Sequence, residues 1–219
     1  MTSLAPRRWT RRGRKERAEL DKLRAQVRQL TRELAAQRDA AEHDALTGLV
    51  NRRGFYPRAL RMLTGPGRQQ VTMMMLDLDG FKPINDEYGH RVGDRVLVTV
   101  ADRLVTSLDG WLPARLGGDE LAAIRTGRVD PRHLATRVTA LAGALAAPMR
   151  VNGHRLRVSA AIGVATANGP IGLEELLDRA DTAMYRAKAL GHPVISPPAP
   201  PPGPAPAART AGPSMAAVS

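Results

Sequence analysis

The order of apolar segments between residues 44 and 195 most narrows the folds open to this chain. Apolar runs of strand length alternate there with longer segments whose apolar residues recur every three or four positions, as in helices packed on one side. Hairpin signals occur among the crossovers, so neighbouring strands run in both directions. The pattern predicts an α/β (α+β) fold in which helices flank a mixed central β-sheet, as in a ferredoxin-type or polymerase-palm-like domain.

Each expected element follows from its own periodicity and from the turn residues beside it. Asn152-Gly153 predicts a tight hairpin turn, and Gly117–Glu120 predicts a second one. Helices are expected at Arg52–Leu63, Val92–Leu108, Pro131–Ala147 and Leu173–Leu190, and strands at Val71–Leu76, Trp111–Leu116, Leu121–Ile124, Val158–Ala165 and near Val194.

Residues 18–43 predict a coiled-coil helix ahead of this domain. Leucine and valine recur there at alternating spacings of three and four, which places them on one seam at a and d positions. Such a seam needs cover in water, either from a second copy of the chain or from the domain folded back onto it, and we favour a parallel homodimer. The seam residues are Leu20, Leu23, Val27, Leu30 and Leu34.

The two ends of the chain are expected to be disordered. Residues 1–17 form an Arg-rich arm, and residues 1–40 account for +7 of the net charge of +12. Such an arm is either a solvated tail or a contact for nucleic acid or an anionic membrane. Residues 196–219 hold eight of the seventeen prolines, which predicts a polyproline-like tail that is passive or binds an unknown partner.

Composition limits the compartment and the kinds of metal site. The chain has no cysteine, which excludes disulfides and thiolate metal sites. No stretch approaches the roughly 20 apolar residues of a membrane-spanning helix, and the N-terminus lacks the apolar core of a signal peptide. We therefore expect a soluble, cytoplasmic protein.

Carboxylates occur at two places where strands end. Asp77 and Asp79 follow an apolar strand, at a sheet edge where their hard oxygens suit Mg²⁺ carrying nucleotide phosphates. Gly117 and Gly118 would allow close approach of a ligand, and they precede Asp119, which we expect to face Asp77 across the sheet. Two converging carboxylates suit phosphoryl transfer, although each motif alone also fits a plain loop or turn.

Five motifs spaced along residues 44–195 together resemble the GGDEF diguanylate cyclase family. Four of them match its patterns DxLTGLxNRR, DxDxFKxxNDxxGHxxGD, RxGGDE and ADxAMYxAK, and one resembles its SxGIA-like strand, all in the same order. In this chain the motifs lie at Asp44–Arg53, Asp77–Asp94, Arg115–Glu120, Ser159–Gly163 and Ala180–Lys188.

The resemblance implies a role for each motif residue. Asp77, Asp119 and the carbonyl of Leu78 would hold two Mg²⁺ or Mn²⁺ ions per active site, and Glu120 would assist the attacking hydroxyl. Asn85 and Asp94 would read the guanine edge, since an amide and a carboxylate match its donors and acceptor. The remaining substrate contacts would be Lys82 and Lys188 on the triphosphate, with Phe81, Gly117 and Gly118 beside it.

The reaction implied by the resemblance requires two copies of the domain. Each copy would bind one GTP, and each ribose 3′-hydroxyl would attack the α-phosphate held by the other, releasing cyclic di-GMP and two pyrophosphates. A coiled coil would hold the two domains near each other and so raise their effective concentration.

Three positions depart from the family pattern. Leu121 replaces phenylalanine, and His192 replaces an arginine that could bind phosphate in a bidentate manner. Leu108–Trp111 lacks the RxxD of an inhibitory product site, so feedback through that site is not expected. These departures leave one alternative open: a degenerate domain that binds GTP or cyclic di-GMP as a sensor.

Overall fold

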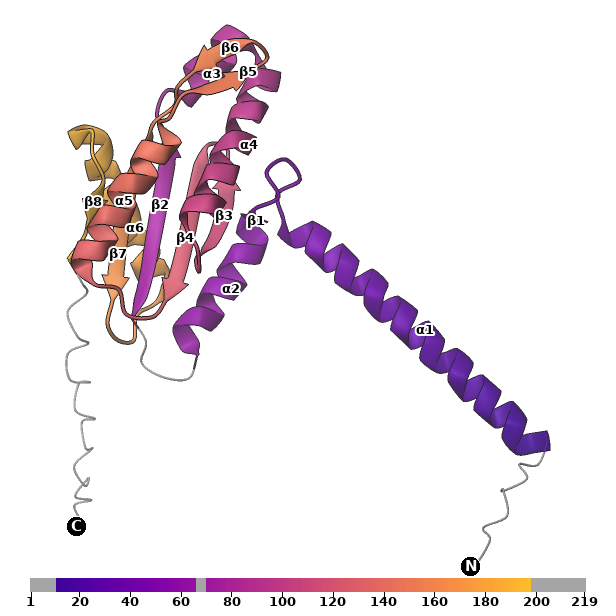
Figure 1. Cartoon of the computed structure of the whole chain (residues 1–219). Coiled ribbons are helices and arrows are strands. Elements are labelled where there is room, and N and C mark those ends of the chain that lie inside the picture. Colours follow the sequence, from indigo (N-terminus) through magenta and orange to yellow (C-terminus); the bar gives the residue numbers. More distant parts are fainter. Residues whose placement is uncertain (1–10, 66–69, 198–219) are drawn as a thin grey trace, which may run out of the picture.

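The computed structural model describes residues 11–65 and 70–197, apart from the side chains of residues 11–14. Its fourteen elements alternate largely as the periodicity predicts (Figure 1). The helices are α1 Arg11–Glu42, α2 Arg52–Thr64, α3 Phe81–Tyr88, α4 His90–Ser107, α5 Pro131–Leu145 and α6 Leu173–Leu190. The strands are β1 Val50–Asn51, β2 Val71–Leu78, β3 Leu112–Gly117, β4 Glu120–Thr126, β5 Met149–Val151, β6 His154–Leu156, β7 Ala160–Ala167 and β8 Val194–Ile195.

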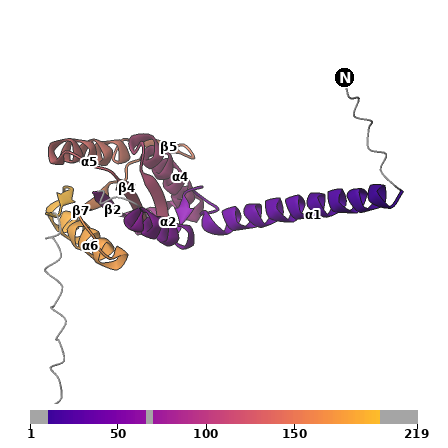
Figure 2. The same cartoon turned by 90° about the horizontal axis from the view of Figure 1, so that it is seen from below.

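A six-stranded mixed sheet organises the domain, in the order β1-β3-β4-β2-β7-β8. The four inner strands pair antiparallel, while β1 pairs with β3 and β8 with β7 in parallel, so the predicted mixed sheet is confirmed. Helices α4 and α5 cover one face and α2 and α6 the other, as both views show (Figures 1 and 2). The hairpin β5–β6 forms a separate two-stranded sheet.

Strand β2 lies in the middle of the sheet and contributes to both hydrophobic cores. Successive side chains of a strand point to opposite faces. Met74 and Leu76 therefore belong to the core under α4 and α5, whereas Met73 and Met75 belong to the core under α2 and α6. The same alternation places Asp77 on the α2/α6 face, at the end of the strand.

Helix α6 lies unusually close to β7 because of Gly163. A Cβ built on this glycine would lie 2.0 Å from the backbone N of Met184 and 2.2 Å from the carbonyl oxygen of Ala180. Real Cβ atoms do not approach backbone this closely, so only glycine allows α6 to pack here. The contact holds the last turns of α6 against the sheet.

Helix α1 extends away from the sheet as a long stalk (Figures 1 and 2). The expected seam is exposed along it: the side chains of Leu20, Leu23, Val27, Leu30 and Leu34 have relative exposures from 48% to 63%. The helix begins at Arg11, so residues 11–17, which we expected within the disordered arm, are helical. Arginine, lysine and glutamate are good helix formers, which accounts for the extension. Residues 1–10 lie outside the described part.

Two further details differ from the sequence-based expectations. Helix α3 was not expected, since its eight residues are too few to show a clear period. Strand β2 continues to Leu78, so Asp77 lies inside the strand rather than after it. The expected tail lies outside the described residues from 198 onward. Among the described helices, none combines the length and the apolar character that a membrane span requires.

Candidate active site

Two carboxylates lie side by side where β2 ends and β4 begins. In the register of these antiparallel strands Asp77 is paired with Glu120, so both side chains point to the α2/α6 face. We had expected Asp119 in that position. An irregularity between Arg115 and Gly117 shifts the pairing of β3 with β4, and Asp119 lies in the turn just before Glu120.

Each of these two carboxylates is paired with a cation from a different helix. Lys188 Nζ on α6 donates to Asp77 Oδ1 at 2.7 Å, and Arg52 Nη2 at the start of α2 lies 3.6 Å from Glu120 Oε2. The hydrogen bond to Asp77 raises the pKa of Lys188 against a smaller opposing effect of burial, and the charges of Asp77, Asp79 and Asp119 add to the rise. Asp119 therefore acts on the same ammonium group as Asp77.

Arg115 connects the turn of the site to the end of the stalk. Its Nε and Nη2 donate to the carbonyl oxygen of Gly118 at 3.0 and 2.8 Å, and its Nη1 donates to Asp44 Oδ1 at 3.0 Å. Asp44 also accepts from the backbone N–H and hydroxyl of Thr47. Burial alone would raise the pKa of Asp44, but these hydrogen bonds outweigh it and hold that pKa below its ordinary value.

Four of the residues expected to bind the nucleotide lie on α3 and α4. Lys82 is exposed on α3, and Asn85 is partly buried three residues along the same helix. A Cβ on Gly93 of α4 would lie 1.9 Å from Asn85 Oδ1, so the absence of a side chain there makes room for the amide. The ring of Phe81 is 9% exposed and belongs to the core, which leaves its main chain for any substrate contact. Asp94 is exposed in the second turn of α4.

Asp79 is hydrogen-bonded to Ser159, the residue before β7. Its Oδ2 accepts from the hydroxyl of Ser159 at 2.8 Å, and its backbone N–H donates to the Ser159 carbonyl at 2.9 Å. A cavity of about 310 Å³ opens beside it, lined by Asp79, Lys188 and His192 with alanines of α5, β7 and α6. His192 Nδ1 lies 3.0 Å from the carbonyl oxygen of Pro193. Leu121 is 1% exposed in the core, so it fills a packing position.

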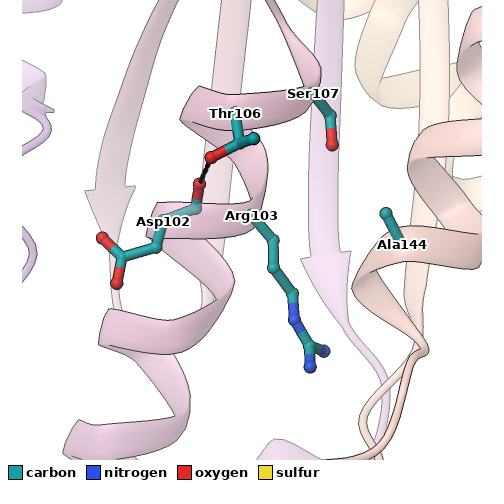
Figure 3. Close-up of a pocket in the computed structure, with 5 residues that line it drawn as sticks. All are labelled: Asp102, Arg103, Thr106, Ser107 and Ala144. Carbon is teal, nitrogen blue, oxygen red and sulfur yellow. Dashed lines mark hydrogen bonds between the residues drawn. The ribbon is translucent and has the colours of Figure 1, made fainter.

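A second cavity, of about 250 Å³, lies between α4 and α5 (Figure 3). Its lining residues come from the C-terminal half of α4 and from Ala144 of α5, away from the turn that carries Asp94. Arg103 in this cavity donates to the carbonyl oxygens of Leu145, Ala147 and Pro148, which lie at and just beyond the C-terminus of α5. Its guanidinium is thus occupied in capping a helix.

The donors at the sheet edge fit a divalent cation that carries phosphate oxygens. Within residues 11–65 and 70–197, no three histidine or acidic side chains lie close enough to hold a metal by themselves. Asp77, Asp119 and the Leu78 carbonyl are all hard oxygen donors, and Mg²⁺ commonly takes one or two carboxylates with the rest from water and phosphate. The ammonium group already on Asp77 shows that this position accepts a cation.

Reasoning from the sequence missed several residues that shape the site. Arg52 was not given a role, although it lies in the first motif, and Gly93 and Ser159 lie in the second and fourth. Their place inside matched motifs was the available signal. Arg52 and Ser159 contact residues distant in the chain, and Gly93 lies against the preceding helix, so no local pattern reveals these contacts.

Comparison with known proteins identifies the family of this chain. A family model described as "Diguanylate cyclase, GGDEF domain" matches residues 41–193. The diguanylate cyclase DgcS of Shewanella oneidensis is 35% identical over 156 residues, which cover 69% of this chain and 51% of that protein. The chain spans about half the length, or less, of the first curated relatives it matches.

Solved structures share the fold. The coiled coil and GGDEF domain of DgcB from Caulobacter crescentus, in complex with c-di-GMP, matches with a TM-score of 0.73 and 26% identity, covering 84% of this chain and 98% of that one. The GGDEF domain of TpbB from Pseudomonas aeruginosa matches with a TM-score of 0.63 and 36% identity, covering 70% and 92%. This chain therefore belongs to the GGDEF diguanylate cyclase family.

Proposed function

We propose that this chain is a diguanylate cyclase that condenses two GTP molecules into cyclic di-GMP and two pyrophosphates. The observation that carries the proposal is the pairing of Asp77 with Glu120 on one face of the sheet, with Asp119 beside them and Lys188 within reach. Carboxylates from separate segments that converge on one point suit metal-assisted phosphoryl transfer. The resemblance of five motifs to those of the GGDEF diguanylate cyclase family supports GTP as the substrate.

Asp77, Asp119 and the carbonyl of Leu78 would hold the metal, as Mg²⁺ or Mn²⁺ with two ions per site. Bound there, the ions would neutralise charge on the phosphates and lower the pKa of a bound hydroxyl. Glu120 would accept the proton of the ribose 3′-hydroxyl of the other GTP. Its ion pair with Arg52 orients this carboxylate.

Residues on α3, α4 and α6 would hold the nucleotide. Asn85 and Asp94 would hydrogen-bond the guanine edge, and the short helix α3 begins at Phe81 with backbone N–H groups available for phosphate oxygens. Lys82 and Lys188 would add positive charge on the triphosphate. Gly117 and Gly118 would let the substrate approach the turn closely.

A parallel coiled coil would bring the two half-sites together. With the seam residues Leu20, Val27 and Leu34 at a positions, Glu19 and Glu33 fall at g and Arg24 and Arg38 at e. A parallel dimer sets each g residue against an e residue of the partner, pairing acid with base. An antiparallel dimer would set like charges together, so the charge pattern favours the parallel one. We place this dimer in the cytoplasm, where its substrate GTP is found.

The direct test is product formation from GTP and Mg²⁺ by the purified chain, followed by chromatography. We expect cyclic di-GMP from the wild type and none from Asp119→Ala, with a specific activity that rises with protein concentration. Persistent GTP binding without any product would instead favour a nucleotide sensor. In that case His192, which replaces the expected arginine, is the first position to examine by His192→Arg.

A further inference from the structure

Lys188 is hydrogen-bonded to Asp77 and is also expected to bind the triphosphate, and its ammonium group cannot do both at once. Its Nζ lies 2.7 Å from Asp77 Oδ1, on the carboxylate that is expected to bind the metal. The same side chain is expected to bind the triphosphate. An ammonium group this close to Asp77 Oδ1 fills the space that a metal ion on that oxygen would need.

The ammonium group of Lys188 is also close to three carboxylates, those of Asp77, Asp79 and Asp119. The side chain of Asp77 is 18% exposed, so an unpaired charge there would be costly, and Lys188 supplies the pairing. Asp79 and Asp119 act on the same ammonium group through space. Glu120 faces Asp77 but has its own partner in Arg52. Without metal, Asp77 and Glu120 are thus each paired with a cation of the chain itself.

We propose that Lys188 is an exchangeable counter-ion that makes metal binding depend on nucleotide. In the nucleotide-free protein it neutralises Asp77 and competes with free divalent cations for that carboxylate. When metal and triphosphate arrive together, the metal takes Asp77 and the ammonium group moves to the phosphates, keeping its proton throughout. This inference rests on the proposed function, because it takes Asp77 as a metal ligand.

The structure permits this movement without moving the helix. Lys188 is 49% exposed in the last turn of α6, and it lines the cavity of about 310 Å³ beside Asp79. The close contact at Gly163 fixes the backbone of α6 against β7, so the exchange falls to the flexible four-carbon side chain. The Lys188 side chain can therefore move from Asp77 into the cavity by changing its torsion angles.

The consequence is a positive coupling between metal and nucleotide. A ligand that removes Lys188 from Asp77 frees that carboxylate for the metal, and a bound metal in turn releases Lys188 for the phosphates. By linkage, each ligand strengthens the other by the same factor. Lys188 is half-exposed and its pairing with Asp77 is screened by water, so we expect an effect at the low end of typical couplings, about five- to tenfold.

The test measures Mn²⁺ binding without turnover, from the electron paramagnetic resonance signal of free Mn²⁺. Full-length wild type and Lys188→Met are titrated with Mn²⁺ alone and then with α,β-methylene-GTP, in which the bond to be broken is blocked. Lys188→Met should bind Mn²⁺ alone about five- to tenfold more tightly than the wild type. It should also bind the analogue more weakly and lose most of the coupling between the two ligands.

Three variants separate this exchange from a general loss of charge. Lys188→Arg keeps a cation at the position and should leave Mn²⁺ affinity near the wild-type value. Arg186→Met removes a positive charge from an exposed position of the same helix. In the described part of the chain Arg186 forms no ion pair with Asp77, so this substitution should change Mn²⁺ affinity little. Asp77→Asn should weaken Mn²⁺ binding in every background.

Equal Mn²⁺ affinity in wild type and Lys188→Met would overturn the exchange, and so would an equal gain in Arg186→Met. Either result leaves the cyclase assignment intact if GTP still yields cyclic di-GMP. Failure of every variant to bind Mn²⁺, even with the analogue, would overturn the metal role of Asp77 and this inference with it. The product assay then decides separately whether the proposed function survives.

Discussion

At the scale of single residues, Arg115 ties two distant parts of the chain to one guanidinium group. It holds the Gly118 carbonyl next to Asp119 and the carboxylate of Asp44 at the end of the stalk. Charge-assisted, partly buried hydrogen bonds of this kind contribute about 1.5–3 kcal/mol each. Arg115 opens the RxGGDE motif, and it contacts both the turn of that motif and Asp44.

Asp44→Asn tests this connection through its pH dependence. We expect the free energy of unfolding at pH 7 to fall by about 1–2 kcal/mol, because the amide cannot replace a charged acceptor. The pKa of Asp44 is lowered from 3.8 in the folded protein, so its stabilisation is complete above that value and is lost as the pH falls further.

Urea denaturation at pH 7, 5 and 3 measures this difference. The gap between wild type and Asp44→Asn should be constant from pH 7 to 5 and should narrow by pH 3. An unchanged gap at pH 3 would contradict the assigned charge. Asp102→Asn is the control, since its exposed carboxylate has no partner among the described residues and should change stability by no more than about 0.5 kcal/mol.

At the scale of elements, the contact between α6 and β7 decides where Lys188 lies. Gly163→Ala would set a methyl group against the backbone of Met184 and Ala180, so α6 must shift away from the sheet. Overpacking of this kind typically costs about 1–3 kcal/mol. Because α6 carries Lys188, we also expect weaker GTP binding.

Gly143→Ala is the matched substitution for this prediction. Gly143 lies within α5, and a Cβ there would meet no atom within 4 Å. Alanine in place of glycine inside a helix should stabilise it by about 0.5–1 kcal/mol. Thermal denaturation should therefore move in opposite directions for the two variants. Equal shifts would show that the α6–β7 contact is not tight.

At the scale of the whole molecule, the exposed seam of α1 should control activity through dimerisation. Leu23→Glu with Leu30→Glu places charges on the seam, where a parallel dimer would bury them. We expect a monomer by sedimentation and a loss of specific activity of at least about tenfold, since each site needs the other. Thermal stability of the domain should change little, because both leucines are exposed in the single chain.

Ala25→Glu with Ala36→Glu adds the same charge on the outer faces of α1 and should leave both dimer and activity intact. Retained dimerisation in the leucine double variant would mean that another surface joins the two copies. Loss of activity in both double variants would point to charge on the stalk, rather than to the seam.

The sequence by itself determined much of the local structure and supplied the motifs from which the site residues are proposed. Helix α6 has the predicted bounds Leu173–Leu190, and the hairpin turns at Asn152-Gly153 as expected, because period and turn chemistry are properties of neighbouring residues. The motifs identified the acids and lysines in the same way. The short helix α3 was missed because eight residues carry too little periodicity.

Only the tertiary structure decided which of these residues meet. The regular antiparallel register of β2 with β4 placed Glu120, rather than Asp119, opposite Asp77, and left Asp119 in the turn before β4. Packing at Gly163 brought Lys188 to Asp77, which lies 111 residues away in the chain, and Arg115 reached Asp44 across 71. Such contacts depend on how elements stack in space, which no local pattern encodes.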